Sequence, residues 1–206
     1  MKTAEDEGII VADTAFTDVA TLRKRARENL DEGAVTEGYS LDADQICELL
    51  NESLATELVC VLRYRRHYFM AHGIVGAPVA AEFLAHAKEE QMHADNIAER
   101  IVQLGGEPDF DPQTLTSRSH AEYVEGDTLV DMIRENLIAE RIAIDSYREL
   151  IQHIGDRDST TKRMLEAILA DEEHHADDMK DLLEDLPGDI AALQKQAQAP
   201  RGGKRR

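Results

Sequence analysis

The sequence predicts an all-α fold in which four long helices form a bundle, with one long crossover between the second and third helices. Apolar residues recur at the helical period, and few β-branched residues follow one another. Glycine and proline divide the chain into four blocks of about 28 residues, each roughly 42 Å long as a helix. Short links within each pair of blocks predict antiparallel neighbours, and the loop of about 20 residues between the pairs predicts the crossover.

The first two helices are expected between residue 40 and the double glycine near residue 105. The first helix should run from Ser40, a candidate N-cap, to His72, because Gly73 follows. The second helix should carry Pro78 in its first turn and end at Gly105. Both blocks are long enough to span a bundle.

The crossover and the last two helices follow the same punctuation. Residues 105–126 contain two prolines and few apolar positions, which is typical of a connection. The third helix should start after Asp127, a candidate N-cap, and stop at Gly155. The fourth helix should follow Asp158 and stop at Leu186, before a proline and a glycine.

The two ends of the chain differ in composition from the bundle of residues 40–187. Residues 1–39 form a polar extension, with a possible amphipathic helix around residues 18–30. Residues 188–206 form a short C-terminal segment whose basic tail we expect to be disordered. The cations of this tail, which offer a weak contact to DNA, are Arg201, Lys204, Arg205 and Arg206.

Acidic residues outnumber basic residues by 42 to 23, and the formal charge is −19. Such a charge argues against nucleic-acid binding by the body of the domain and is compatible with attracting cations. No apolar run approaches the roughly 20 residues that cross a bilayer, and the N-terminus lacks the basic-then-apolar order of a signal peptide. We therefore expect a cytoplasmic protein without a membrane partner.

The two cysteines do not predict a disulfide. Cys47 and Cys60 fall 13 residues apart on one expected helix, which separates them by roughly 20 Å. Bridged cysteines have Cα atoms within about 7 Å of each other, so a bond between them is excluded.

A glutamate interrupts the inward-facing apolar row of every predicted long helix near its middle. These glutamates are Glu57, Glu90, Glu140 and Glu172. Glu90 and Glu172 are each followed three residues later by a histidine, His93 and His175. A spacing of three places a carboxylate and an imidazole on one helix face, where both can bind the same ion.

The pattern is repeated in the two halves of the chain. Glu57 precedes Tyr64 by seven residues and Glu90 by 33, while Glu140 precedes Tyr147 by seven and Glu172 by 32. This repetition predicts two related helix hairpins, each contributing one glutamate and one Glu-x-x-His pair. The two tyrosines are more often core residues than electron donors at such positions.

The chemistry of this residue set favours metal ions over an empty site. Four buried carboxylates would repel one another and take up protons, whereas two divalent cations balance their charge. Oxygen and imidazole ligands without thiolate suit iron or manganese better than structural zinc. Two bridged ions can bind dioxygen or peroxide between them, so the set predicts redox chemistry.

Neighbouring residues leave alternatives for the ligand set. His174 adjoins His175, but choosing it would pair it with Asp171 and leave the apolar row. His67 lies near the face of Glu57 and is a candidate third-iron or access ligand, as is Glu89. We therefore assign the histidine of the fourth helix to position 175.

The segments that carry these ligands resemble those of the bacterioferritin branch of the ferritin-like superfamily. The resemblance covers roughly residues 41–186 and rests on residues 50–58, 90–95 and 171–175, with Glu140 at the ligand position of the third helix. It implies a ferritin-like four-helix bundle and a ferroxidase centre of two iron ions per subunit. Fe(II) would be oxidised there by dioxygen or hydrogen peroxide, and a ferric mineral would be stored inside a hollow homo-oligomeric shell.

The same resemblance implies a role for each site residue. Glu57 and Glu140 would be terminal ligands, and Glu90 and Glu172 would bridge the ions. The nitrogen ligands would be His93 and His175. Tyr64 matches a tyrosine that the family keeps near its centre.

Three features depart from the bacterioferritin pattern. Haem-binding members use a methionine immediately after the second-helix glutamate to bind the haem. This chain has Gln91 at that position, so we do not expect haem binding. The segment after Pro187 is short for the family's fifth helix, and the crossover is longer than in that family. The short C-terminal segment and the long crossover are similar to those of Dps-like proteins, which form smaller tetrahedral shells and can contact DNA through basic tails. The sequence therefore leaves the size of the shell open.

Other functions are compatible with the same ligands. A di-manganese or di-iron peroxidase or catalase would use them without storing mineral. A rubrerythrin-like peroxidase usually has an extra carboxylate on its third helix and a CxxC iron domain, but this chain has Ala143 one turn after Glu140 and no CxxC. A Dps-like shell that protects DNA from peroxide is the remaining alternative.

Overall fold

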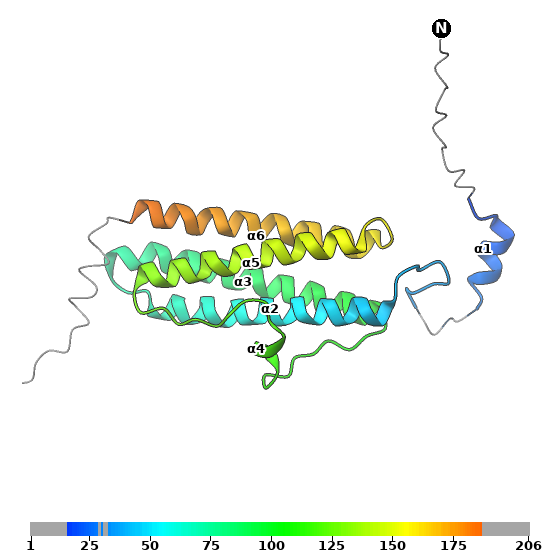
Figure 1. Cartoon of the computed structure of the whole chain (residues 1–206), viewed down its shortest axis with the longest axis horizontal. Helices are drawn as coiled ribbons and strands as arrows, with labels where there is room; N and C mark the ends of the chain where they lie inside the picture. The colour runs from blue at the N-terminus through cyan, green and yellow to red at the C-terminus, as the bar shows by residue number, and fades with distance from the viewer. Residues whose placement is uncertain (1–15, 29, 31–32, 187–206) are drawn as a thin grey trace, which may run out of the picture.

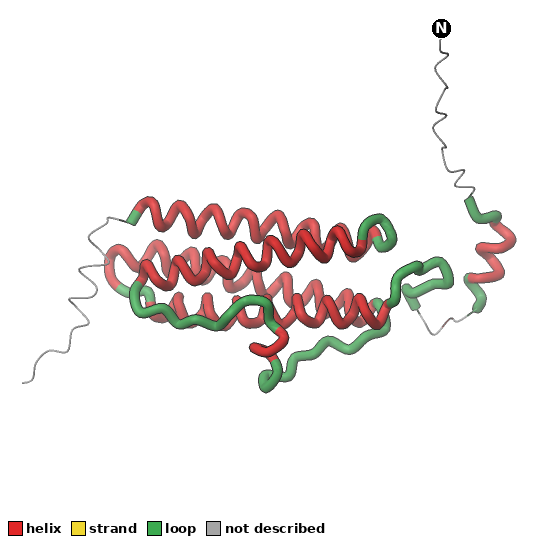
Figure 2. Tube along the Cα trace, viewed as in Figure 1, coloured by secondary structure: helices red, strands yellow, loops and turns green. Residues whose placement is uncertain are grey.

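The computed structural model describes residues 16–28, 30 and 33–186, and its described elements are helices (Figures 1 and 2). Four long helices form the bundle: α2 (Ala43–Met70), α3 (Gly73–Gln103), α5 (Leu129–Ile154) and α6 (Ser159–Asp185). Two short helices, α1 (Val19–Arg25) and α4 (Leu115–Arg118), lie outside it. The predicted all-α four-helix bundle is confirmed. Within the described residues, no helix is both long and apolar enough to span a membrane.

The crossover determines the direction of the second pair of helices. A short link joins α2 to α3, and another joins α5 to α6, so each pair is antiparallel. Residues 104–128 carry the chain back along the bundle, so that α5 starts at the end where α3 also starts (Figure 1). Helices α3 and α5 therefore run in the same direction, as do α2 and α6.

Two predicted helix starts are wrong by one or two residues, because in each case a residue further along the chain than the predicted one caps the helix. The N-cap of α2 is Asp42 rather than Ser40, and its carboxylate accepts hydrogen bonds from the backbone N–H groups of residues 44 and 45. The N-cap of α5 is Thr128 rather than Asp127, since Thr128 forms a reciprocal capping box with Asp131. Such caps satisfy amide groups that the first helical turn leaves unpaired.

Helix α3 also starts earlier than Pro78 predicts. It begins at Gly73, which has a φ of 88°, so Pro78 is its sixth residue. A Cβ atom on Gly76 would lie 3.1 Å from the carbonyl carbon of Ala71, the C-cap of α2. The absence of a side chain at Gly76 allows the first turn of α3 to pack against the end of α2.

The expected helix around residues 18–30 is shorter than predicted. Helix α1 ends at Arg25, and none of its residues is buried. Asp18 caps its first turn, and Arg25 pairs with Glu37 at 2.8 Å. Isolated helices of this length gain little without tertiary packing, which explains the early end.

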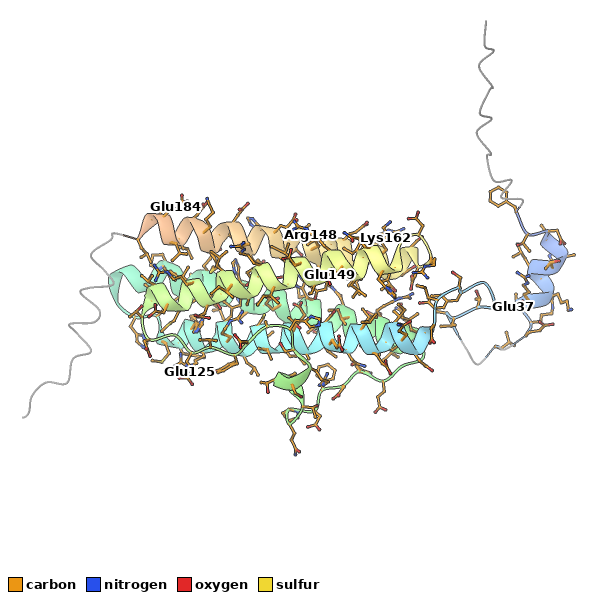
Figure 3. The ribbon with its side chains drawn as sticks, viewed as in Figure 1. Glu37, Glu125, Arg148, Glu149, Lys162 and Glu184 are labelled. Atoms are coloured by element: carbon orange, nitrogen blue, oxygen red, sulfur yellow. The ribbon has the colours of Figure 1, made fainter. Side chains whose placement is uncertain are left out.

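The two largest apolar clusters of the bundle have a polar layer between them. The first cluster lies toward the N-terminal half of α2 and includes Leu50, Leu54, Ile97, Ile101, Leu150, Ile154 and Leu165. The second lies toward the C-terminal half of α2 and includes Phe83, Ala87, Leu129, Ile133 and Met179. The four predicted glutamates lie between these clusters, near the middle of each helix. Charged side chains such as Glu184 and Lys162 lie instead on the outside of α6 (Figure 3).

The crossover covers one side of this polar layer. Leu115 of α4 packs against Val59 of α2, and Ala121 packs against Cys60. Both Cys60 and Cys47 are buried free thiols, in agreement with the predicted absence of a disulfide. The long connection therefore seals the centre of the bundle against solvent on the α2 side.

A buried ion pair joins α3 to the start of α6. An Arg100 guanidinium nitrogen lies 2.9 Å from the Asp158 carboxylate, and Arg100 Nε donates to Thr161 Oγ1 at 2.7 Å. The Tyr39 hydroxyl donates to the same carboxylate at 3.0 Å. Burial opposes ionisation of Asp158, but hydrogen bonds from Thr161 and Arg100 outweigh it and lower the pKa to about 2. Asp158 also caps α6, so one carboxylate fixes three segments.

We predict that Asp158→Ala lowers the free energy of unfolding by about 3–5 kcal/mol, because it leaves Arg100 buried without its partner. Urea unfolding at pH 7 measures the change. The depressed pKa means that this stabilisation is complete above about pH 4 and is lost as the pH falls through about 2. Asp156→Ala is the matched control, since the Asp156 side chain is 99% exposed in its pair with Lys162. Equal effects of the two substitutions would contradict the prediction.

Candidate metal centre

The structure brings the six predicted ligand side chains together in the polar layer. Each of the four long helices contributes one glutamate, and α3 and α6 each add a histidine one turn later. Burial is nearly complete for the whole set, which comprises Glu57, Glu90, His93, Glu140, Glu172 and His175. His174, the alternative on α6, is 74% exposed. The inward face of α6 therefore presents His175.

The six side chains form two overlapping groups of four. One group is Glu57, Glu90, His93 and Glu172, and the other is Glu90, Glu140, Glu172 and His175. Within each group, one donor atom from every residue lies within 4.8 Å of the others. The two groups share Glu90 and Glu172, so the arrangement has room for two cations with two carboxylates between them.

Eight buried donor atoms of this set have no hydrogen-bond partner. They are Glu57 Oε2, Glu140 Oε2, both carboxylate oxygens of Glu90 and of Glu172, and Nδ1 of His93 and His175. An unsatisfied buried polar group costs about 1–3 kcal/mol, and more when charged. Eight such atoms pointing at one another are unfavourable in a metal-free core but are the donors that two cations need. The residues therefore fit a dinuclear metal centre.

Two tyrosines hold the remaining oxygens of the outer glutamates. The Tyr64 hydroxyl of α2 donates to Glu140 Oε1 of α5, and the Tyr147 hydroxyl of α5 donates to Glu57 Oε1 of α2. Each tyrosine thus bonds the glutamate of the other helix hairpin. These bonds leave one free oxygen, Oε2, on Glu57 and on Glu140.

Carboxylates behind the two histidines orient their rings. His93 Nε2 lies 3.2 Å from Asp171 Oδ2, and His175 Nε2 lies 2.8 Å from Glu89 Oε2. A carboxylate that accepts a hydrogen bond from Nε2–H favours the tautomer whose Nδ1 lone pair is available to a metal ion. His93 Nδ1 faces Glu172 Oε1 at 3.1 Å and Glu57 Oε2 at 3.3 Å. Glu89, a candidate third-iron ligand, thus has a position behind His175.

The pKa values of these groups reflect crowded negative charge. Burial and the neighbouring carboxylates raise the pKa values of Glu90 and Glu172 well above their ordinary range. Burial also opposes the charge on Glu57, but the adjoining His93 imidazolium outweighs it and lowers the Glu57 pKa. The three nearby glutamates overcome burial at His93 and raise its pKa. In the metal-free protein, protons thus take the place of the positive charge that metal ions would supply.

The centre has the pseudo-two-fold symmetry that the sequence repetition predicts. Glu57 and Glu140 are 83 positions apart, while Glu90 and Glu172 are 82 apart. The tyrosines and the second-layer carboxylates correspond in the same way, Tyr64 with Tyr147 and Glu89 with Asp171. Equivalent residues of the two hairpins therefore play equivalent structural parts.

His67 does not join the centre, so its predicted role as a third-iron or access ligand is not supported. Its Nε2 lies 3.2 Å from the carbonyl oxygen of Val124 and 3.0 Å from that of Glu125. Burial and the nearby Arg63 cation lower its pKa to about 4. A neutral His67 thus attaches the crossover to α2.

Two buried residues near the centre were not predicted from the sequence. Arg63 is 1% exposed, and its guanidinium donates to the Asn136 side chain at 2.9 Å and to the Glu122 carbonyl at 3.0 Å. Its position beside the apolar row offered no signal for burial. His86 Nδ1 lies 3.1 Å from the Tyr64 hydroxyl, and its heptad spacing before His93 was a signal that could have found it.

Comparisons with known proteins agree with this architecture. A model of the ferritin-like domain matches residues 47–188. A bacterioferritin from Streptomyces coelicolor is 32% identical over 146 residues, which cover 69% of this chain and 83% of that protein. A nutrient stress-induced DNA-binding protein from Synechococcus is 30% identical over 138 residues, which cover 64% of this chain and 77% of that protein.

A solved structure gives the same result. The dodecameric thioferritin of Bacteroides fragilis, a bacterioferritin-related protein, superposes with a TM-score of 0.68 and 32% identity, over 77% of this chain and 93% of that one. The matched residues 47–188 include most or all of each of the four helices that carry the centre. The chain belongs to the ferritin-like family and is a relative of the bacterioferritins.

Proposed function

We propose that this chain binds Fe(II) at the dinuclear centre, oxidises it with dioxygen or hydrogen peroxide, and stores the ferric product inside a homo-oligomeric shell. The observation that carries the proposal is the set of eight buried, unpaired donor atoms arranged as two groups with two shared glutamates. The relatives named bacterioferritin and the dodecameric thioferritin support iron as the metal and a shell as the assembly.

Each predicted ligand has a place in this proposal. Glu90 and Glu172 belong to both groups and would bridge the ions, whereas Glu57 and Glu140 each belong to one group and would be terminal ligands. His93 and His175 would supply one nitrogen to each ion. Two Fe(II) ions bring four positive charges to four carboxylates and, on oxidation, provide the two electrons that reduce dioxygen to hydrogen peroxide or hydrogen peroxide to water.

The tyrosines act in the proposal by positioning the terminal glutamates. A hydroxyl bound to Oε1 keeps Oε2 of the same carboxylate directed at the metal position. The family resemblance points to Tyr64 alone as a residue of the centre, and the symmetry of the site extends the same positioning role to Tyr147. Both hydroxyls are buried. Burial, and to a smaller extent the adjoining glutamates, raises their pKa values, so both hydroxyls stay protonated at neutral pH.

Storage and DNA protection differ in features outside the centre. The net charge of −19 would attract Fe(II) to an assembly of these chains. The Synechococcus relative is named for DNA binding, and a DNA contact by this chain would depend on the basic tail of residues 200–206. That tail lies outside the described residues, so iron storage is the function that the described geometry supports best.

We predict that Glu90→Ala and His175→Ala each abolish rapid Fe(II) oxidation, because each removes a donor from the centre. Stopped-flow absorbance of ferric product after aerobic addition of Fe(II) measures the rate, and size-exclusion chromatography checks assembly. His174→Ala is the matched control, since His174 is the exposed neighbour of His175. Oxidation at the wild-type rate in both ligand variants would refute the assignment.

We predict that the metal-free assembly retains far more than about two iron ions per subunit after stepwise aerobic addition of Fe(II). Iron that passes through a two-metal site can accumulate only if a cavity holds the product. Iron analysis of the soluble assembly after gel filtration gives the ratio. A plateau near two would contradict storage and favour a di-iron or di-manganese peroxidase, to be examined with Mn(II) and hydrogen peroxide.

We predict that Glu90 and Glu172 make the metal-free protein lose stability as the pH rises above about 4.5, the ordinary pKa of a glutamate. The pKa values of Glu90 and Glu172 are raised by folding, so the folded state binds more protons than the unfolded state above about pH 4.5, and stability falls as these protons leave. Glu172→Gln should reduce this slope, whereas Glu173→Gln, at an exposed neighbour, should leave it unchanged. Thermal unfolding midpoints across this pH range measure the slope, and an equal slope in wild type and Glu172→Gln would contradict the explanation.

A further inference from the structure

A third cluster of possible metal ligands adjoins the dinuclear centre. Glu82 and His86 lie four residues apart on α3, and Asp178 faces them from α6. One donor atom from each of the three lies within 4.8 Å of the others. His86 is buried, while the Glu82 and Asp178 side chains are 41% and 27% exposed. The cluster therefore reaches from the surface to the interior, and none of its members belongs to the six residues of the centre.

The Nε2 atom of His86 is directed at the two carboxylates of the cluster, and Asp178 is its hydrogen-bond partner. The single proton of the Tyr64 hydroxyl is donated to Glu140, so this hydroxyl accepts from His86 Nδ1, which lies 3.1 Å away. In this tautomer the lone pair of neutral His86 is on Nε2, where a cation would replace the contact with Asp178. That nitrogen lies 3.2 Å from Asp178 Oδ2 and 3.6 Å from Glu82 Oε1. One nitrogen and two oxygen lone pairs thus converge, which is an arrangement that a divalent cation satisfies.

This cluster breaks the pseudo-symmetry of the centre. The position 82 residues after His86 is Ile168, which is buried in the apolar core. The position 82 residues after Glu82 is Met164, which packs against the same core. One flank of the centre is therefore closed by apolar side chains, while the other carries an imidazole and two acids. The structural requirements of a duplicated bundle do not explain this difference.

A further group connects the cluster to the centre. His86, Glu89 and His175 also place donor atoms within 4.8 Å of one another. The rings of His86 and His175 stack with centroids 4.0 Å apart, and His175 is itself a member of the centre. Successive groups share His86 and then His175. They form a continuous series of donor atoms from the exposed carboxylates to the buried glutamates.

We propose that Glu82, His86 and Asp178 form a third divalent-cation site through which ions exchange between the surface and the dinuclear centre. The site would take Fe(II), and also Mn(II), Co(II) or Zn(II), because it offers one imidazole and two carboxylates. Partial exposure of both acids makes it a site of rapid exchange rather than of storage. The exchange role rests on the proposed function of the centre, whereas cation binding by these three residues does not.

Anomalous diffraction from crystals of the full-length assembly soaked with Co(II) tests the binding site. The wild type should show three cobalt peaks per subunit, two in the centre and one between Glu82, His86 and Asp178. Glu82→Gln combined with Asp178→Asn should lose only the third peak, and Glu90→Ala should keep it while losing the centre. No third peak in the wild type, or its persistence in the double variant, would overturn the site. A wild-type crystal that shows the third peak but lacks the two central peaks would instead refute the dinuclear metal centre.

Rates of Co(II) loading and of its removal by EDTA test the exchange role. A passage affects both directions equally, so the double variant should load and release the central ions roughly tenfold more slowly at low ionic strength, with unchanged affinity. The control replaces the exposed acids of α6 in the same number, Asp181→Asn with Glu184→Gln. Wild-type rates in the double variant, or equal slowing in the control, would overturn the passage.

Discussion

The burial of four carboxylates in one layer is the constraint on which the rest of this structure depends. Glu57, Glu90, Glu140 and Glu172 each lie at the middle of a long helix, where side chains cannot reach water. Their mutual repulsion would destabilise the bundle unless protons or cations compensated it. The apolar clusters on either side supply the stability that this layer costs, which is why the helices continue for several turns beyond the centre.

Most polar residues around this layer serve to hold it in one arrangement. Tyr64 and Tyr147 occupy one oxygen of each outer glutamate, and Asp171 and Glu89 fix the two histidine rings. The crossover excludes water on the α2 side, where His67 attaches it. A preformed set of donors avoids the entropy of ordering ligands when an ion binds, so much of the affinity of such a centre is supplied by folding.

The sequence predicts the bundle and the position of the ligands because both depend on helical periodicity. A glutamate in an apolar row, with a histidine one turn later, can point only toward the axis of the bundle. Periodicity does not say which residue caps a helix, so the predicted caps are Ser40 and Asp127, whereas the observed caps are Asp42 and Thr128. Periodicity also does not predict contacts between helices that are distant in the sequence, such as the hydrogen bond between the buried Arg63 and Asn136. His67 shares a helix face with the ligands, but its imidazole contacts two backbone carbonyls of the crossover instead of the centre.

The crossed tyrosine bonds make the metal centre depend on complete folding of the bundle. Because Tyr64 and Tyr147 each bond a glutamate of the opposite hairpin, neither hairpin alone holds its own outer glutamate in place. A partly unfolded chain would present scattered acids that bind metal ions weakly. Full docking of the two hairpins is what creates a site able to hold a pair of ions. Under the proposed function, Fe(II) oxidation would thereby be confined to subunits that have finished folding.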